Sequence, residues 1–501
     1  MIPYTLLLER AAETPDKTVF ISKAAGEVSF SQLAVKSSCI ARALQKFGIG
    51  KGDVIAVLLP NCMEIIETYI AAGAIGASFQ PLDFRFQGEE LKSALINTAV
   101  KMLISHTSAV TEGLESVVPA SVQKIMVGGQ RPGWAGYEEI FAGAADEMAP
   151  PAVNEEKDIA LFLYSSGSTS EIKCIPMTFR QLDFFPDDLA CFWDLSVIQR
   201  GISLLPLSHI SGAVITNTCL KFGVSYVITV RFTPASILEL MARHHVTWTH
   251  TVPSIAGLLL RGNPEKYDLS HMKMIALMGT SVPVSLLKDL ERVIPSVQAI
   301  QGYGLTETSP LLTLEPPRDD AKKIGTIGKA LLGVDIRLVD ENGKAVPVNE
   351  PGELIVRGQK VLSGYYGNPK LTERVFNDGW FYTKDVAKCD ADGFFYHLGR
   401  LDDLIITGGL NVFPAEVEAA AIQYPKVKEA VAYAIPDASR GQVIGMDVCP
   451  CEGCDIVPGE LKRFLQSRLA SYKIPMKIHL VDGISHTPTG KPIRKPKETD
   501  V

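Results

Sequence analysis

Apolar residues along this chain follow two spacings, one typical of helices and one typical of buried strands. Residues 33–49 repeat apolar positions every three or four residues, which predicts an amphipathic helix. A glycine-containing turn and an apolar run at 53–60 follow, which predict a buried strand, and residues 63–77 predict the next helix. Strand and helix patterns keep alternating up to about residue 323. This alternation predicts parallel βαβ units and therefore an α/β fold with a doubly wound sheet.

The pattern changes in the last third of the chain. Residues 333–358 contain short β-rich runs separated by Asn-Gly and Pro-Gly turns, which predict antiparallel strands and a small β-barrel. From Leu404 the pattern predicts a small α+β unit, with helices at 412–425 and 458–471 and strands at 427–436 and 477–482. The predicted organisation is a large domain at 1–402 (two βα subdomains to about 323 and the barrel at about 324–402) and a C-terminal domain at 403–501.

Composition narrows the class of protein. A chain of 501 residues is too long for one hydrophobic core, and 46% hydrophobic with 21% charged residues is typical of globular proteins. A net charge of -7 argues against a general nucleic-acid binder. No signal-peptide pattern and no run of about 20 apolar residues is present, so we expect a cytoplasmic protein without a transmembrane segment. It is expected to be a monomer or homodimer.

Nine scattered cysteines fit a reducing compartment. Cys449, Cys451 and Cys454 lie close together, but a closed zinc site needs four ligands. Free thiols in a loop are the simpler interpretation.

A serine- and glycine-rich segment follows the apolar run at 159–164. Its exposed backbone N–H groups, its hydroxyls and a lysine suit phosphate oxygens. The residues are Ser165, Ser166, Gly167, Ser168, Thr169 and Lys173. The spacing differs from that of the P-loop motif, and a simple linker has the same composition.

Residues 301–308 place an aromatic ring between glycines and a carboxylate beside hydroxyls. Tyr303 between Gly302 and Gly304 is suited to lie on a flat base. Glu307 beside Thr306 offers the hard oxygen ligands that Mg²⁺ prefers. A glycine-rich turn with a surface glutamate remains the alternative.

Three further charged residues suit nucleotide chemistry. Asp385 can accept hydrogen bonds from a ribose diol, and Arg400 can bind ribose or phosphate oxygens. Lys491 lies on a loop stiffened by proline and glycine, from which domain movement can deliver it to a site. Taken singly, each residue also fits a surface ion pair or a solvated tail.

In this order, the four segments resemble the adenylate-forming superfamily of acyl- and aryl-CoA synthetases, adenylation domains and firefly luciferase. The similarity runs from about residue 15 to 494, and GRLDDLIITGGLNVFPAEVE at 399–418 is its most specific part. YGLTE, GELIVRG, SGYYGNP and PTGK support it. The resemblance implies doubly wound αβαβα layers, a small barrel and a mobile C-terminal domain. It implies an acid–CoA ligase that makes an acyl-adenylate from ATP and then a thioester, with ATP, Mg²⁺ and coenzyme A.

The resemblance also assigns roles to individual residues. For the nucleotide, it implies that Ser165 to Lys173 hold the β- and γ-phosphates, that Gly279 and Thr280 border adenine and substrate, that Tyr303 and Gly304 face adenine, and that Asp385 and Arg400 bind ribose.

For the first reaction step, the resemblance implies that Thr306 lies near the α-phosphate, that Glu307 and Thr169 bind the metal, that Lys491 bridges the carboxylate and the α-phosphate, and that His209 is an aromatic gate beside the acid. For the second step, it implies that Asp402 is the hinge and that Gly408 and Gly409 admit the pantetheine arm.

This sequence departs from the family pattern at Ser170, Ile172 and Cys174 in the phosphate loop, and Lys384 replaces a common glycine before Asp385. We therefore expect activity with altered ATP handling.

Two alternatives remain. An adenylation enzyme that loads a carrier protein in trans would have the same motifs. A non-catalytic acyl or nucleotide binder would explain the altered phosphate loop, although Glu307 and Lys491 argue against it. If the protein is an acid–CoA ligase, its substrate is a small carboxylic acid. An apolar pocket alone does not identify which acid it is.

Overall fold

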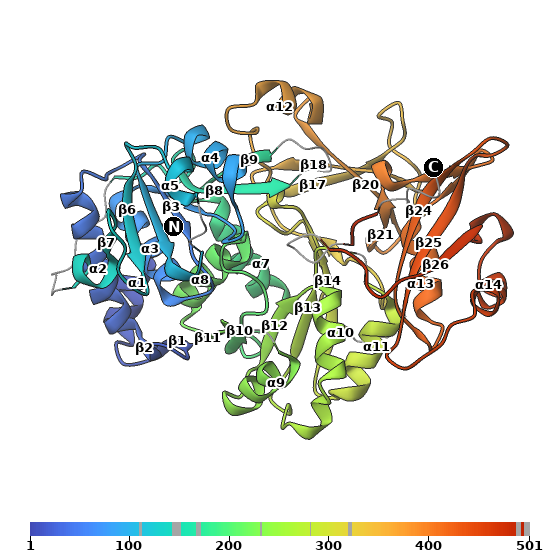
Figure 1. The fold of residues 1–501 in the computed structure, drawn as a ribbon, viewed down its shortest axis with the longest axis horizontal. Coiled ribbons are helices and arrows are strands. Elements are labelled where there is room, and N and C mark those ends of the chain that lie inside the picture. The colour runs from blue at the N-terminus through green and yellow to red at the C-terminus, as the bar shows by residue number, and fades with distance from the viewer. Residues whose placement is uncertain are drawn as a thin grey trace.

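The computed structural model describes residues 1–109, 113–142, 152–166, 172–230, 233–280, 282–318, 323–486 and 492–494. Figure 1 shows two sheets flanked by helices in the N-terminal part, an antiparallel sheet after them, and a separate small unit at the C-terminal end. The α/β fold class predicted from the sequence is confirmed, with a large N-terminal and a small C-terminal domain.

The first sheet has seven strands in the order β7-β6-β5-β3-β4-β8-β9. They are β3 (Val54–Leu58), β4 (Ser78–Pro81), β5 (Met102–His106), β6 (Gln123–Val127), β7 (Ala135–Gly136), β8 (Ile159–Ser166) and β9 (Ile172–Thr178). All pairs are parallel except β8 and β9, which run antiparallel on either side of the predicted phosphate loop. The loop is therefore the connection of a hairpin at one edge of this sheet.

The second sheet has nine strands in the order β16-β15-β14-β13-β12-β10-β11-β1-β2. They are β1 (Thr18–Ser22), β2 (Gly26–Ser29), β10 (Arg200–Ile202), β11 (Ser225–Ile228), β12 (Trp248–Thr251), β13 (Met274–Leu277), β14 (Gln298–Tyr303), β15 (Thr313–Leu314) and β16 (Lys329–Ala330). The central strands are parallel. The N-terminal strand β1 pairs with β11, about 200 residues later, a pairing that local patterns do not predict.

Helices cover both sheets and fill the space between them. The middle layer contains α1 (Pro3–Glu13), α2 (Phe30–Lys46), α3 (Met63–Ile75) and α8 (Ile210–Phe222). The outer layers contain α4 (Gly88–Asn97) and α5 (Leu114–Val117) on the first sheet, and α9 (Pro234–Arg243), α10 (Pro253–Arg261) and α11 (Val284–Val293) on the second. Two short helices, α6 (Tyr137–Ile140) and α7 (Phe184–Phe192), complete this part. The result is the expected αβαβα layering.

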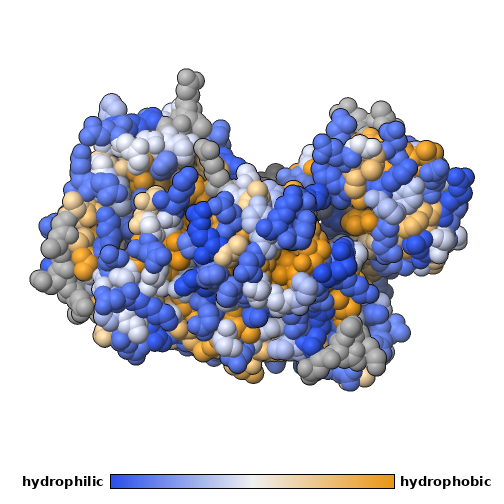
Figure 2. All heavy atoms as spheres, turned by 90° about the horizontal axis from the view of Figure 1, so that it is seen from below, coloured by the Kyte–Doolittle hydropathy of each residue, from blue (hydrophilic) through white to orange (hydrophobic). Residues whose placement is uncertain are grey.

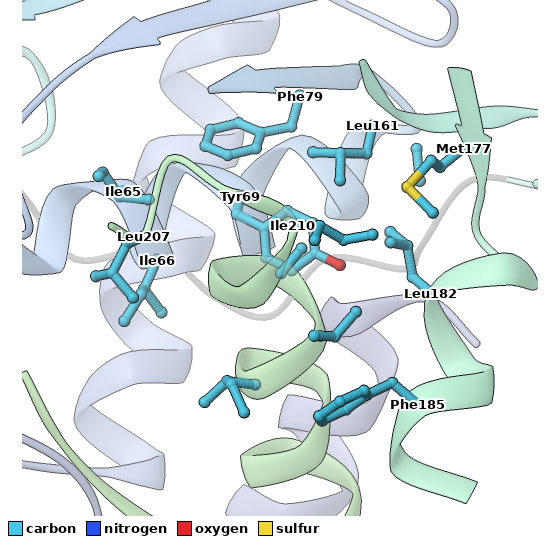
Figure 3. Close-up of a cluster of buried hydrophobic side chains, with 14 of the residues drawn as sticks. Ile65, Ile66, Tyr69, Phe79, Leu161, Met177, Leu182, Phe185, Leu207 and Ile210 are labelled. Carbon is cyan, nitrogen blue, oxygen red and sulfur yellow. The ribbon is translucent and has the colours of Figure 1, made fainter. Parts of the chain in front are cut away.

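The middle layer holds the largest hydrophobic core. Figure 3 shows Tyr69 of α3, Phe79 of β4 and Ile210 of α8 meeting between the sheets. Tyr69 donates a hydrogen bond to Asn217 on α8, so its buried hydroxyl is satisfied. This core fixes the two sheets relative to each other, which any site formed by loops from both sheets requires.

Helix α2 starts earlier than its apolar spacing predicts. Ser29 accepts a hydrogen bond from the backbone N–H of Gln32, and the Gln32 side chain accepts one from the N–H of Ser29. This capping box satisfies two free donors of the first turn and begins the helix at Phe30. The predicted start at residue 33 marked the buried face and missed the cap.

A five-stranded antiparallel sheet follows, in the region where a small barrel was expected. It contains β17 (Val334–Val339), β18 (Gly352–Gly358), β19 (Phe376–Asn377), β20 (Trp380–Cys389) and β21 (Phe395–Arg400), with α12 (Pro369–Val375) beside it. The long strand β20 pairs with β18, β19 and β21. This sheet leads directly into the C-terminal domain.

The C-terminal domain has its own sheet and core. Its strands are β22 (Ile405–Thr407), β23 (Leu410–Val412), β24 (Val427–Asp437), β25 (Gly441–Pro450) and β26 (Lys477–Leu480), and its helices are α13 (Pro414–Ile422) and α14 (Pro458–Gln466). The sequence analysis did not predict β25, which pairs with β22, β24 and β26. Figure 2 shows this domain as a lobe separated from the main body by an indentation. In the described residues, no helix has the length and apolarity needed to cross a membrane.

Candidate active site

The parallel strands of the second sheet bring several predicted residues to one edge. His209 is the N-cap of α8, in the connection that follows β10; Gly279 and Thr280 follow β13; and Tyr303 ends β14. Ligands of open α/β sheets bind at the carboxyl ends of the strands, and all four residues lie there. Gly279 has φ +89°, a backbone conformation that glycine adopts without strain.

A tight turn after Tyr303 carries the next two predicted residues. A Cβ atom at Gly304 would lie 1.8 Å from the backbone oxygen of Pro310, so only glycine allows this approach. The chain then forms a short 3₁₀ helix, Thr306–Thr308. Thr306 and Glu307 are partly exposed and lie on this turn, three and four residues after Tyr303.

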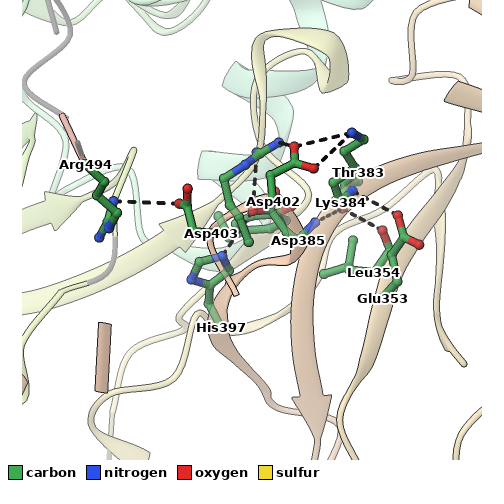
Figure 4. Close-up of polar contacts among 11 residues, drawn as sticks. Glu353, Leu354, Thr383, Lys384, Asp385, His397, Asp402, Asp403 and Arg494 are labelled. Atoms are coloured by element: carbon green, nitrogen blue, oxygen red, sulfur yellow. Dashed lines mark hydrogen bonds and ion pairs between the residues drawn. The ribbon is translucent and has the colours of Figure 1, made fainter. Parts of the chain in front are cut away.

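Asp385 is the centre of a buried polar cluster that joins the second sheet to the antiparallel sheet. Its Oδ2 accepts a 2.7 Å hydrogen bond from the Tyr303 hydroxyl, and its Oδ1 lies 3.3 Å from Nε2 of His397. Arg400, its cross-strand partner on β21, forms an ion pair with Oδ1 at 3.5 Å. Figure 4 shows Asp385 and His397 close together at this junction. The structure thus brings Tyr303, Asp385 and Arg400 together.

The charges of this cluster favour an ionised aspartate. Burial alone would raise the pKa of Asp385, but the hydrogen bond and charge of His397, then Arg400 and Tyr303, outweigh it, so the pKa is lowered. Burial and the Asp385 charge raise the pKa of Tyr303 well above its ordinary value, so its hydroxyl keeps the proton that it donates. A carboxylate has about four acceptor sites, so Asp385 retains capacity for a ligand hydroxyl beside these partners.

The backbone around Asp385 is held by neighbouring polar groups. Thr383 donates a 2.6 Å hydrogen bond to the backbone oxygen of Leu354 and accepts one from the N–H of Asp385. The N–H of Lys384 donates to Glu353 at 3.0 Å. Lys384 has φ +62°, which explains why glycine is common here in the family that the sequence resembles. These contacts orient Asp385 before any ligand binds.

Glu307 is oriented by a residue that the sequence analysis did not single out. The Tyr365 hydroxyl donates a 3.0 Å hydrogen bond to Oε1 of Glu307. Burial and the Glu307 charge raise the pKa of Tyr365 well above its ordinary value, so it remains a donor. Nζ of Lys173, on β9, lies 5.5 Å from the centre of the Tyr365 ring. Tyr365 therefore connects the strand after the phosphate loop to the predicted metal ligand.

Two functional candidates, His397 and Tyr365, were missed by sequence reasoning. Tyr365 lies in SGYYGNP, which was used only as a family signature, and a tyrosine there has no distinctive spacing to Glu307. His397 is 12 residues from Asp385 and faces it only because β20 and β21 pair. Strand pairing of this kind is a long-range property of the fold.

Several of the predicted site residues belong to the phosphate loop or to the C-terminal loop. Gly167, Ser168, Thr169 and Lys491 fall outside the described residues. Ser165 and Ser166 end β8 as the last two residues before the phosphate loop. The roles predicted for these residues therefore stay predictions.

The connection to the C-terminal domain contains the predicted hinge and, shortly after it, the two glycines predicted to admit the pantetheine arm. Asp402 lies in the 3₁₀ turn Leu401–Asp403, between β21 and β22. Gly408 and Gly409 form the exposed turn between β22 and β23, with φ +57° and +80°. Two successive left-handed residues define the hairpin turn in which glycine is strongly favoured. The turn therefore accounts for the two glycines whether or not a pantetheine arm passes over them.

The cysteine-rich segment shows ordinary thiols. Cys449 is buried with Sγ 3.4 Å from the backbone oxygen of Asp482, and Cys451 lies beside the backbone oxygen of Pro425. Among the residues that the structure describes, no group of three or more His, Cys, Asp or Glu side chains could hold a metal ion.

Family models match most of this chain. The model described as AMP-binding enzyme matches residues 7–366, and the model of the AMP-binding enzyme C-terminal domain matches residues 416–491. This chain belongs to the AMP-binding enzyme family. The resemblance to acyl- and aryl-CoA synthetases is confirmed. Nucleotide and coenzyme A are ligands of this family. Tyr303 lies within the range of the first model, whereas Asp385, His397 and Arg400 lie between the ranges of the two models.

Relatives in the AMP-binding enzyme family are similar over almost their whole length. A feruloyl-CoA synthase of Amycolatopsis is 32% identical over 488 residues, which cover 97% of this chain and 96% of that protein. A 2-succinylbenzoate–CoA ligase of Bacillus licheniformis is 30% identical over 494 residues, covering 97% and 98%.

A solved structure extends this similarity to the fold. It is the o-succinylbenzoate CoA synthetase of Bacillus subtilis in complex with its acyl-adenylate intermediate, with TM-score 0.85 and 28% identity over 97% of this chain and 96% of that one. The prediction of an AMP-forming acid–CoA ligase is therefore confirmed.

Proposed function

We propose that this chain activates an aromatic carboxylic acid with ATP and transfers the acyl group to coenzyme A. The observation that carries the proposal is the convergence of Tyr303, Asp385 and Arg400 at the carboxyl edge of the second sheet. The relatives named for feruloyl and succinylbenzoate substrates support an aromatic acid. Fatty acids and short diacids are the alternatives that an acid panel separates.

The nucleotide would be held mainly by preoriented groups. Asp385 accepts the ribose hydroxyls, Arg400 neutralises the aspartate and contacts ribose, and the turn from Gly304 to Glu307 faces the phosphates. Because His397 and Thr383 already orient this carboxylate, little reorganisation is needed on binding. His209, at the neighbouring strand end, would border the carboxylate of the acid.

Glu307 fits a divalent cation. Tyr365 occupies Oε1, whereas Oε2 of Glu307 has no hydrogen-bond partner in the described part of the chain. Hard carboxylate oxygens suit Mg²⁺, and Thr169 is the second proposed ligand. When bound, Mg²⁺ would neutralise phosphate charge. For this cation the protein supplies the Glu307 carboxylate, which Tyr365 holds in position.

A carboxylate oxygen attacks the α-phosphorus, the bond from that phosphorus to the bridging oxygen breaks, and pyrophosphate leaves. Because this attack joins two anions, positive charge must be supplied as the pentacoordinate centre forms. We assign this role to Lys491, with Thr306 beside the α-phosphate. After adenylation, rotation at Asp402 would withdraw Lys491 and bring Gly408 and Gly409 to the site, where glycine allows the pantetheine arm to pass closely.

The direct test measures AMP and thioester formation over aromatic, fatty and dicarboxylic acids, with and without coenzyme A. We expect coenzyme A-dependent thioester formation with at least one aromatic acid. Thioester formation only on a phosphopantetheinylated carrier protein would identify the carrier-loading alternative. Background pyrophosphate exchange with every acid would contradict the proposal.

Lys491→Ala separates the two half-reactions. Removal of its charge should slow adenylation by about 10²- to 10³-fold, the effect of losing one oxyanion-stabilising contact. Thioester formation from supplied acyl-adenylate should change much less, because Lys491 has left the site in that step. Pyrophosphate exchange and single-turnover transfer measure the two rates. Equal losses in both would contradict the assigned role.

A further inference from the structure

Lys384 occupies a backbone position that normally favours glycine. Its φ is +62°, and it directly precedes the ribose-site aspartate Asp385. A non-glycine residue in this conformation carries a steric cost that glycine does not. A lysine at this position brings a charged side chain to a site where glycine would have none.

The side chain of Lys384 reaches the predicted hinge. Its Nζ lies 3.1 Å from Oδ1 and 3.3 Å from Oδ2 of Asp402, so the ammonium bridges both carboxylate oxygens. Arg400 lies 3.8 Å from the same carboxylate. Figure 4 shows the Lys384 ammonium directed at Asp402 across the junction of strand β20 and the hinge turn. The Lys384 side chain thus connects strand β20 of the large domain to the hinge turn.

The next residue of the turn pairs with a residue near the C-terminal end of the chain. Asp403 lies 3.7 Å from Arg494, three residues after Lys491, and Arg494 also contacts Glu418 on α13 at 2.9 Å. Two adjacent carboxylates therefore connect the turn to Lys384 on β20 and to Arg494 near the C-terminal end of the chain. Arg494, which follows Lys491 by three residues in the sequence, thus lies at the turn between β21 and β22.

We propose that Lys384 is a positioning residue whose ion pair with Asp402 latches the hinge turn in the adenylation arrangement. The latch must open before the C-terminal domain rotates for thioester formation. This inference rests on the proposed function, because it assigns the rotation to Asp402. It implies that this chain, compared with a relative that has glycine at this position, favours the first half-reaction over the second.

The expected size of the effect follows from exposure. The side chains of Lys384 and Asp402 are 51% and 38% exposed, and exposed ion pairs contribute modestly and are screened by salt. Opening the latch should therefore change rates by about two- to fivefold. The effect should shrink as ionic strength rises.

Two variants of Lys384 distinguish the ion pair from backbone strain. Lys384→Gln removes the charge and keeps the left-handed backbone, whereas Lys384→Gly also relieves the strain. Both should speed transfer from supplied acyl-adenylate by about two- to fivefold at low salt, and neither should raise the pyrophosphate exchange rate. Lys370→Gln, an exposed lysine on α12, is the matched control and should leave both rates as in the parent.

A second measurement does not depend on turnover. Amide hydrogen exchange of a peptide spanning residues 398–407 should be about two- to fivefold faster in both Lys384 variants and unchanged in Lys370→Gln. Unchanged exchange there would overturn the latch even if the enzyme is active. A response of the glycine variant alone would assign the effect to strain and also overturn it. If the parent protein forms no thioester, the proposed function fails, and hydrogen exchange still decides the latch.

Discussion

Asp385 and Asp402 are two carboxylates at the same strand pair with opposite surroundings. Asp385 lies opposite Arg400 in the β20–β21 ladder, is 3% exposed and has Tyr303, His397 and Arg400 around it. Asp402 lies two residues after Arg400, has a side chain 38% exposed and pairs with the lysine next to Asp385. The Asp385 carboxylate is fixed by contacts from strands β14 and β21, whereas the Asp402 carboxylate is held by the exposed ion pair with Lys384 and by Arg400 at 3.8 Å.

The difference shows how neighbouring acids serve different purposes. A buried carboxylate held by several partners keeps its charge and geometry, which suits recognition of a ligand that must lie in one place. An exposed pair is worth little and opens easily, which suits a turn whose conformation must change. Burial, more than residue type, separates the proposed binding role from the proposed hinge role.

The largest effect is expected from Asp385→Asn. The variant keeps the shape but removes the charge that Arg400 and His397 face, so kcat/KM for ATP in pyrophosphate exchange should fall about 10²-fold. Steady-state exchange at varied ATP measures it. Asp335→Asn, which removes an exposed carboxylate 3.0 Å from Arg357, is the matched control and should remain within twofold of the parent, as is usual for surface pairs of about 1 kcal/mol or less. An unchanged kcat/KM in Asp385→Asn would remove Asp385 from the nucleotide site.

Asp402→Pro should give the next largest effect, confined to one half-reaction. Proline fixes φ, so the turn can no longer change conformation, and transfer from acyl-adenylate to coenzyme A should fall at least about tenfold. Pyrophosphate exchange should change less than about twofold, since adenylation does not require the turn to move. Rapid-quench assays of each step provide the two rates. Equal slowing of both steps would make Asp402 a structural residue.

The last prediction concerns stability and not a rate, and it involves a buried group without the partners that Asp385 has. In the described part of the chain, neither ring nitrogen of the buried His250 on β12 has a hydrogen-bond partner. Burial, and then the charge of His209, lower the pKa of His250 to about 4. Because its unfolded pKa is about 6.5, the unfolded state binds the extra proton between these values, and stability is lost as the pH falls through that window.

The loss amounts to about 3 kcal/mol between pH 6.5 and 4. His250→Phe should flatten the dependence of the unfolding free energy on pH in this window, as measured by urea denaturation at several pH values. His479→Phe, a histidine on the exterior strand β26, serves as the comparison. An identical slope in the parent and in His250→Phe would show that His250 is solvated in the folded protein.

Local patterns predicted many of the helices and strands, because the apolar spacing of each element depends on residues close together in the sequence. The apolar spacing of α2 and α3, the buried run of β3 and the turns after residue 323 each placed an element correctly, with ends displaced where a cap acts. The strand β25 was missed, since its two glycines and its cysteine-proline end weaken a strand pattern that pairing on both sides stabilises. The pairing of β1 with β11 has no local signal.

The order of residue types alone supplies the chemical groups of the site: a glycine-flanked tyrosine, the carboxylates Asp385 and Glu307, the cations Arg400 and Lys491, and glycines where the backbone turns left-handed. Residue type sets charge, hydrogen-bonding capacity and allowed φ, and all of these are local. The tertiary structure alone decided that Tyr303 and His397 enclose Asp385, that Tyr365 orients Glu307 and that Lys384 holds Asp402. Those contacts depend on strand pairing and burial between segments tens of residues apart, which no local spacing specifies.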